Sequence, residues 1–267
     1  MQKTIKNTVT VSGIGLHTGE DNTVTLSAAP AGTGIVFVQG EKAIKLTPSI
    51  AFGDYLNSYL MLDGHKVYTV EHLIATLFGL GIDNVQIQIN GNEAPILDGS
   101  CKGWVDALAD NMEVLYNNPA KMLKISAPIK VELKDSFAVA FPSDELRITY
   151  VANYGDGTMS YDSVMTSETF INDIANARTF GFERDIEYMR SQGLIKGGSL
   201  DCAVMIYKDG TQSSPDRLPD EKIRHKVLDF IGDMGLLGIQ LKGHFVIYKG
   251  GHTLHGLLRN EIAKMMR

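Results

Sequence analysis

The run from Arg224 to Asp233 carries side chains that could bind a metal ion. His225, Asp229 and Asp233 follow one another at steps of four residues, and residues four apart lie on the same face of an α-helix. The residues between them are largely apolar and would bury the helix in a core. The spacing predicts that His225 and Asp229 reach one metal ion, with Asp233 a turn further along. The same spacing also fits a helix-surface hydrogen bond, and Asp233 could equally be a solvated charge or a carboxylate that orients a histidine ring.

A second pair, Glu71 and His72, lies in another helix-like run, 69–77. Adjacent helical residues point about 100° apart, so a ligand with a neighbouring base fits this pair better than two ligands do. Two histidines and one aspartate, with a glutamate nearby, make up a catalytic zinc site: three protein ligands, an open position and a general base. These residues predict a zinc hydrolase. A structural histidine on an amphipathic helix is the alternative reading of His72.

Four further segments combine polar groups with glycine or an aromatic ring. His252 follows two glycines after a strand-like run, and paired glycines would let a turn present the imidazole. Arg178–Phe180 places a hydroxyl beside an aromatic ring, and Lys196–Ser199 could be a phosphate-holding loop. The glycine-rich turn 13–19, with His17, is a weaker phosphate motif because no helix follows it. An exposed turn or an ordinary loop is the alternative for each segment.

Two parts of the chain repeat one order of elements. Alternating strands precede the helix-like runs 69–79 and 222–236. Each run ends at a Gly-Leu…Gly-Ile sequence and leads into an amphipathic strand. The repeat predicts an α+β fold of two similar halves, 1–118 and 119–267, each a layer of helices on a mainly antiparallel sheet. We expect a pseudo-two-fold axis to relate the halves and the active site to lie between them, although glycine ends so many helices that chance is the alternative.

The composition is that of a globular protein with a sizeable core, with 44% hydrophobic and 21% charged residues among 267. A formal net charge of −6 argues against a nucleic-acid partner and leaves room for an anionic small-molecule substrate. The two cysteines, Cys101 and Cys202, are far apart, which indicates free thiols in a reducing compartment. No signal peptide or membrane-spanning run is evident. We therefore expect a cytoplasmic monomer without stable membrane insertion.

Taken together, seven segments occur in an order found in one enzyme family. The chain closely resembles the UDP-3-O-acyl-N-acetylglucosamine deacetylases, which are zinc enzymes of lipid A synthesis in bacteria of the Gram-negative type. The resemblance covers nearly the whole chain. The segments that carry it are Gly13–Glu20, Thr69–Leu73, Glu93–Ser100, Ala177–Phe180, Gly197–Ser199, Arg224–Asp233 and Gly250–His252.

This resemblance implies hydrolysis of the N-acetyl group of a UDP-linked 3-O-acyl glucosamine, with release of acetate. It matches His72, His225 and Asp229 to the zinc ligands of the family and Glu71 to the general base that activates water. Zinc would be the cofactor, although Fe²⁺ in the cell also suits two imidazoles and a carboxylate.

The resemblance also implies roles around the metal. Thr179 matches a hydroxyl that holds the developing oxyanion, and His252, supported by Asp233, matches the cationic group that stabilises the oxyanion or protonates the leaving amine. Lys226 matches a basic residue on the polar side of the substrate. An insert, here 180–203, would build an apolar passage for the acyl chain. We also expect substrate contacts from Leu16, Phe180 and Gly198.

The chain departs from the family at three places. His255 stands where relatives usually carry asparagine, the segment 57–62 is more apolar, and the loop 209–220 contains two prolines. These departures bear on the nucleotide and acyl-chain contacts. A zinc amidohydrolase for another N-acetylated sugar, and a zinc-stabilised binding protein without turnover, are the alternative functions.

Overall fold

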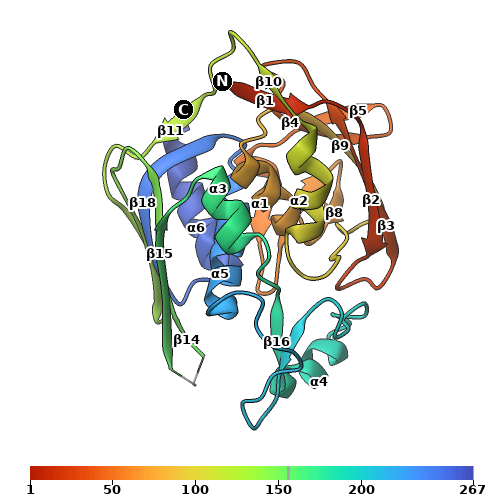
Figure 1. Ribbon diagram of the computed structural model, residues 1–267, viewed down its shortest axis with the longest axis vertical. Coiled ribbons are helices and arrows are strands. Elements are labelled where there is room, and N and C mark those ends of the chain that lie inside the picture. The colour runs from red at the N-terminus through yellow and green to blue at the C-terminus, as the bar shows by residue number, and fades with distance from the viewer. Residues whose placement is uncertain (155–156, 267) are drawn as a thin grey trace.

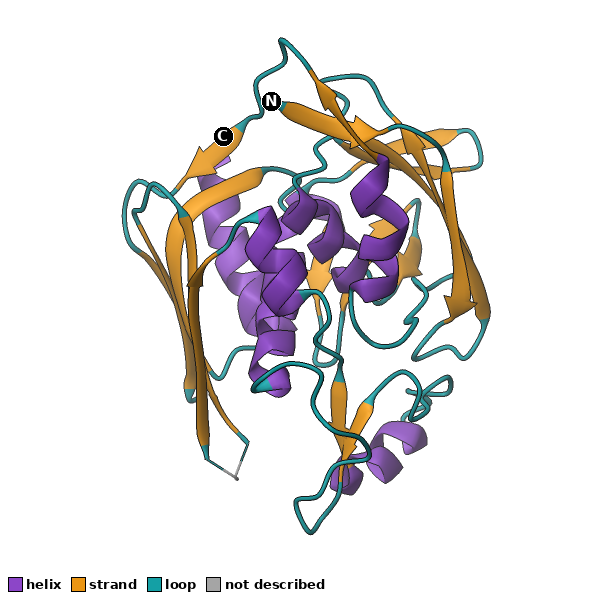
Figure 2. Ribbon diagram, in the orientation of Figure 1, coloured by secondary structure: helices purple, strands orange, loops and turns teal. Residues whose placement is uncertain are grey.

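The computed structural model describes residues 1–154 and 157–266. Two large sheets face each other across a central layer of helices (Figure 1), and the helical layer is enclosed on both sides by strands (Figure 2). The chain thus forms the mixed α+β fold that the alternation of strand-like and helix-like runs predicted.

The first large sheet has the strand order β2-β3-β9-β4-β5. Its central strand, β9, pairs antiparallel with β3 and parallel with β4. Alternate residues of β3 are buried, which places one face of the sheet against the helices. The strands are β2 (Val9–Ile14), β3 (Asp21–Ala28), β4 (Ile35–Gln39), β5 (Lys42–Lys45) and β9 (Val85–Asn90).

The second large sheet repeats this connectivity with the order β12-β13-β18-β14-β15. Its central strand, β18, pairs antiparallel with β13 and parallel with β14, and it also pairs with the short β11. Every second residue of β18 is buried. The strands are β11 (Met122–Lys124), β12 (Ile129–Leu133), β13 (Ser136–Phe141), β14 (Leu146–Asn153), β15 (Thr158–Val164) and β18 (Gln240–Tyr248).

Each central strand is preceded and followed by a helix. Helix α1 (Glu71–Leu80) leads into β9 and α2 (Lys102–Leu108) follows it, whereas α5 (Glu221–Gly235) leads into β18 and α6 (His252–Ala263) follows it. All ten residues of α1 are buried, because the helix lies in the middle of the molecule. The expected helices at 69–79 and 222–236 are confirmed within two residues at each end.

Helices α1 and α5 pack closely because glycine lies where they meet. A Cβ added to Gly232 would lie 2.2 Å from the carbonyl oxygen of Glu71, and one added to Gly235 would lie 2.7 Å from Ile74 Cγ2. No side chain fits at those distances. The glycines of α5 therefore let its backbone approach the first turn of α1, where Glu71 and His72 lie.

Several smaller elements complete the fold. The strands β6 (Ala51–Gly53), β7 (Ser58–Leu62) and β8 (His65–Val67) form a small sheet, and β1 (Gln2–Ile5) pairs with β10 (Met112–Leu115). Strands β16 (Phe180–Phe182) and β17 (Val204–Ile206) flank α4 (Glu183–Ser191) in a projection at the bottom of Figure 1. The short helix α3 (Ser167–Thr169) runs into a π-helical turn, and 3₁₀ turns lie at Pro48–Ile50, Ala109–Asn111 and Lys264–Met266.

Candidate metal centre and active site

Three predicted metal ligands come together from two helices. His72 lies in the first turn of α1, and His225 and Asp229 lie one turn apart on α5. His225 Nε2 is 3.3 Å and His72 Nε2 is 3.8 Å from Asp229 Oδ1. One ligand atom from each residue lies within 4.8 Å of the others, and all three residues are buried. The spacing of four residues on α5 thus brings the side chains of His225 and Asp229 together, as the sequence predicted.

The donor set fits a small divalent cation. Two ligands of a tetrahedral zinc ion, each about 2.0–2.2 Å from the metal, lie roughly 3.3–3.6 Å apart, close to the separations observed here. His225 Nδ1 donates to the carbonyl oxygen of Ala177 at 3.1 Å, which turns its Nε2 toward Asp229. His72 is 4% exposed, and its Nδ1 has no hydrogen-bond partner in the part of the chain that the structure describes.

The charges around Asp229 favour an ionised carboxylate. Burial opposes ionisation, but Lys226 and His225 hold the pKa of Asp229 well below its ordinary value. Lys226 Nζ donates to Asp229 Oδ2 at 2.8 Å, which leaves Oδ1 facing the histidines. Burial lowers the pKa of His225 to about 4. A neutral imidazole and an ionised carboxylate are the forms that bind metal.

Glu71 lies beside this cluster as a buried acid. It is 3% exposed, and its Oε2 accepts a hydrogen bond from the backbone N–H of Ser58 at 3.1 Å. Burial raises the pKa of Glu71 to about 7. A carboxylate with a pKa near neutrality can take up and release a proton under physiological conditions.

His252 lies on the other side of the site and is held by Asp233. It is the first residue of α6, where the paired glycines precede a helix instead of forming the exposed turn considered above. Its Nδ1 donates to Asp233 Oδ2 at 2.9 Å, and its Nε2 lies 3.8 Å from Asp229 Oδ2. Burial alone would lower the pKa of His252, but the negative charges of Asp233 and Asp229 raise it to about 9.

Asp233 also bonds to two residues that the sequence analysis gave no role. Its Oδ2 accepts a hydrogen bond from His255 Nδ1 at 2.7 Å, and its Oδ1 accepts one from Ser58 Oγ at 2.5 Å. His255 lies three residues after His252 on α6, and residues three apart share a helix face. That spacing could have identified His255, whereas no local pattern points to Ser58, which belongs to β7.

The remaining predicted site residues lie around the cluster at various distances. Thr179 is fixed by two backbone hydrogen bonds, to Gly99 and Val204, and lies two residues beyond the carbonyl that His225 contacts. The ring of Phe180 stands edge-on to that of His225, with ring centroids 6.3 Å apart.

The carbonyl oxygen of Leu16 accepts a hydrogen bond from the N–H of Gly197. A Cβ on the neighbouring Gly198 would lie 3.8 Å from Leu16 Cδ1. The glycine-rich turn of the first half and the Gly-Gly-Ser loop therefore lie side by side.

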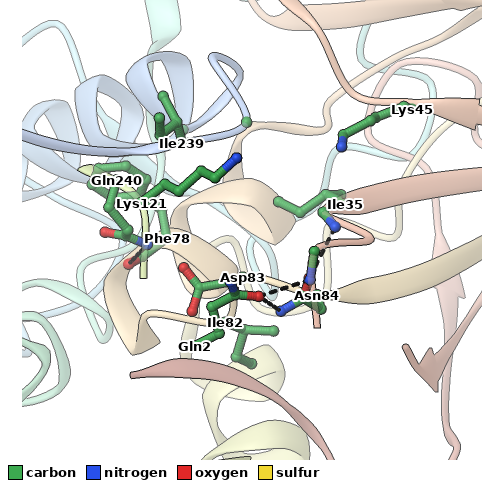
Figure 3. A pocket seen from close by; sticks show the side chains of 14 residues that line it. Gln2, Ile35, Lys45, Phe78, Ile82, Asp83, Asn84, Lys121, Ile239 and Gln240 are labelled. Atoms are coloured by element: carbon green, nitrogen blue, oxygen red, sulfur yellow. Dashed lines mark hydrogen bonds between the residues drawn. The ribbon is translucent and has the colours of Figure 1, made fainter. Parts of the chain in front are cut away.

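A cavity of about 130 Å³ lies away from these residues. Phe78 and Ile82 line it at the C-terminal end of α1, whereas Glu71 and His72 are at the N-terminal end (Figure 3). Lys45 and Lys121 extend along its walls. Asp83, also in the lining, accepts a hydrogen bond from the backbone N–H of Lys3 at 2.8 Å. The candidate active site is the buried cluster at the other end of the helix.

The arrangement fits a hydrolase: three side chains that could hold a metal ion lie close to a buried carboxyl group, Glu71, and a buried imidazole, His252. Comparison with known proteins agrees: residues 2–264 match the family of UDP-3-O-acyl N-acetylglycosamine deacetylases. The chain belongs to this family, and it is therefore a deacetylase, a hydrolase of lipid A biosynthesis. This membership argues against the alternative of a binding protein without turnover.

Three relatives show how far the similarity extends. The UDP-3-O-acyl-N-acetylglucosamine deacetylase of Oleidesulfovibrio alaskensis is 45% identical over 97% of this chain and 88% of its own length. That of Nitratidesulfovibrio vulgaris is 41% identical over 97% of this chain and 86% of its own. That of Synechocystis is 39% identical, and the match spans the full length of both chains. In the described residues, no helix combines the length and the apolar character needed to span a bilayer.

Proposed function

We propose that this chain hydrolyses the N-acetyl group of UDP-3-O-acyl-N-acetylglucosamine to give UDP-3-O-acyl-glucosamine and acetate. The convergence of His72, His225 and Asp229 beside Glu71 and His252 carries this proposal. An amide is a poor electrophile, so its hydrolysis needs a strong nucleophile, a stabilised oxyanion and an acid for the leaving amine. The names of the relatives supply the substrate.

The cofactor in this proposal is Zn²⁺, held by His72, His225 and Asp229, and Fe²⁺ suits the same ligands. When bound, such an ion lowers the pKa of water and polarises a carbonyl group. The buried, closely spaced donor atoms, with Nε2 of His72 and of His225 facing Asp229, support this assignment.

Glu71 is the general base. As a carboxylate it accepts a proton from the attacking water, and its pKa of about 7 suits this task because the group is half ionised near neutrality. Glu71 lies at the start of α1, and the hydrogen bond that its carboxyl group accepts from the Ser58 N–H fixes the orientation of that group.

His252 is the general acid. With a pKa of about 9 the imidazolium form predominates at neutral pH, so the ring can donate a proton to the departing amine or a hydrogen bond to the oxyanion. Asp233 supports His252 by accepting a hydrogen bond from Nδ1–H, which leaves Nε2–H to act on the substrate. The Thr179 hydroxyl is the second donor to the oxyanion, and one such preorganised donor is worth about 3–4 kcal/mol of barrier.

The substrate contacts follow from the surroundings of the cluster. Lys226, whose side chain is 23% exposed, offers a cation on the polar side. Phe180 begins the projection formed by β16, α4 and β17, and in this proposal the segment 180–203 guides the acyl chain. Leu16 and Gly198 form the facing wall.

The proposed architecture has two halves, 1–118 and 119–267, related by a pseudo-two-fold axis with the site between them. The same strand order around β9 and β18, each preceded and followed by a helix, supports the relation. Ligand His72 would come from the first half, and His225 and Asp229 from the second.

Acetate release from acylated and unacylated UDP-N-acetylglucosamine tests the proposal. We expect wild-type protein to prefer the acylated compound, and Phe180→Ala to raise KM for that compound. Equal rates for the two compounds in the wild type would instead favour an amidohydrolase for another N-acetylated sugar.

A further inference from the structure

Glu93 is a fully buried carboxylate outside the metal-ligand cluster. It follows β9 and is 0% exposed. In the described part of the chain, no lysine, arginine or histidine side chain lies within 4 Å of its oxygens. A buried negative charge is costly unless hydrogen bonds replace its hydration. The groups that donate those hydrogen bonds therefore show which segments the Glu93 carboxylate joins.

The turn at Gly15–Thr18 supplies three of the donors. The backbone N–H of His17 lies 2.9 Å from Glu93 Oε1 and 3.1 Å from Oε2, and the N–H and hydroxyl of Thr18 each lie 2.8 Å from Oε2. Successive N–H groups of a turn form a nest for an anion. A Cβ on Gly15 would lie 2.4 Å from Oε2, so only glycine leaves room for the carboxylate.

The fourth donor comes from the segment that begins α1. The hydroxyl of Thr69 lies 2.6 Å from Glu93 Oε1. Thr69 has φ +55°, a left-handed conformation that strains a β-branched residue. Such strain persists only where the surroundings enforce it. Thr69 lies two residues before Glu71, so its hydrogen bond to Glu93 holds the chain directly before the start of α1.

The turn also presents a free imidazole. His17 is 6% exposed, and neither of its ring nitrogens has a hydrogen-bond partner among the described residues. Buried polar atoms normally have partners, so two unpaired nitrogens on one ring point to a group that arrives with a ligand. The turn packs on the Gly-Gly-Ser loop, because the N–H of Lys196 donates to the carbonyl oxygen of His17 and the N–H of Gly197 donates to that of Leu16. In the proposed function this loop and Leu16 form a wall of the substrate site.

We propose that Glu93 is a positioning residue for the deacetylation: its carboxylate clamps the His17 turn to the strained Thr69, so that the His17 ring faces the substrate while Glu71 and His72 enter α1 in the productive arrangement. This inference rests on the proposed function. It assigns Glu93 two separable effects, one on substrate binding through Thr18 and one on the chemical step through Thr69.

Three variants separate these effects. Glu93→Gln keeps the shape of the side chain but replaces one acceptor by a donor that faces other donors. Thr18→Val and Thr69→Val each remove one hydroxyl tie. Thr4→Val is the matched control, because Thr4 is also 3% exposed like Thr69, and its hydroxyl makes one hydrogen bond, to the Ala29 N–H, away from Glu93.

Steady-state kinetics of these proteins, at temperatures where each is fully folded, gives the test. We expect Thr18→Val mainly to raise KM, Thr69→Val mainly to lower kcat, and Glu93→Gln to do both, with kcat/KM lower by about 10- to 100-fold, the cost of a small misplacement. Thr4→Val should stay within about twofold of the wild type. The proposal is overturned if the three variants lose no more kcat/KM than Thr4→Val, or if all three lose it only in proportion to their unfolded fraction.

The ¹⁵N signals of the His17 ring test the clamp without turnover. In metal-free protein we expect them to shift in Glu93→Gln and Thr18→Val and not in Thr4→Val, and unchanged signals in all three contradict the clamp. If wild-type protein releases no acetate from the acylated UDP sugar, the proposed function fails, and these signals still decide whether Glu93 positions His17. Should Glu93→Gln fail to fold, the two threonine variants decide.

Discussion

The imidazole of His252 is bound through Nδ1 to the carboxylate of Asp233 at 2.9 Å. Both side chains are buried, with Asp233 at 0% and His252 at 5% exposure. Because they belong to adjacent helices, α5 and α6, this bond fixes the direction of the ring as well as its charge. The pairing converts an ordinary histidine into one that remains protonated at neutral pH.

Asp233→Asn should weaken the acid. Removing the negative charge lowers the pKa of His252, so the basic limb of the kcat/KM profile should move to lower pH, with activity at pH 8 lower by about 10²-fold or more. Ser58→Ala removes one hydrogen bond to Asp233 but keeps its charge, so it should leave the limb in place. An unchanged limb in Asp233→Asn would show that the carboxylate does not tune His252.

The wild-type pH profile should be bell-shaped. Glu71 acts as a base only when ionised, so activity should rise as pH increases through about 7. His252 acts as an acid only when protonated, so activity should fall as pH increases through about 9. Initial rates of acetate release between about pH 5 and pH 10 measure both limbs, because this range extends about one to two pH units beyond the two pKa values. A profile that rises throughout would exclude His252 as the acid.

Gly232→Ala should damage both packing and activity. The new methyl group would lie 2.2 Å from the carbonyl oxygen of Glu71, so α1 must move away from α5 and carry His72 with it. We expect a loss of about 1–3 kcal/mol in the free energy of unfolding and a large fall in kcat.

Gly256→Ala is the control for a helical glycine. Its nearest neighbour, the N atom of Gly53, lies 3.6 Å from the added Cβ. Relief of the helix penalty of glycine should stabilise the protein by about 0.5–1 kcal/mol. Denaturant unfolding of both variants measures the difference, and equal destabilisation by the two substitutions would contradict the close contact at Gly232.

Arg178→Ala should destabilise the loop behind Thr179. The guanidinium binds both oxygens of Glu221, each at 2.9 Å, and also contacts Ser214 and Pro215. Glu221 is only 2% exposed, so removal of the guanidinium leaves a buried carboxylate without its paired cation. A broken buried pair costs about 3–5 kcal/mol, whereas Arg147→Ala, which breaks an exposed pair with Asp162, should change the melting temperature little. Similar melting temperatures for the two variants would contradict this account.

The local patterns of the sequence predicted the parts of the fold that depend on local periodicity. The step of four residues in α5 placed His225 and Asp229 on one face, and the alternation in β18 matched its buried face. The repeated order of helix and strand predicted two similar halves, and the two large sheets have equivalent strand orders around β9 and β18.

Hydrogen bonds between segments far apart in the sequence could not be predicted from a local pattern. The bond from the His17 N–H to Glu93 spans 76 residues, and that from Ser58 to Asp233 spans 175. Nothing in the spacing of either pair reports the contact, because the fold alone brings them together. The three-stranded sheet of β6, β7 and β8 was likewise not predicted, although its β7 alternates and carries Ser58.

In the mechanism we propose, Glu71 acts as a base beside a metal ion held by His72, His225 and Asp229. Metal content and acetate release, measured together on the wild type and Glu71→Gln, test it most directly. We expect both proteins to hold about one metal ion per chain and Glu71→Gln to lose at least about 10²-fold in kcat. Wild-type activity in Glu71→Gln with its metal retained would contradict the account.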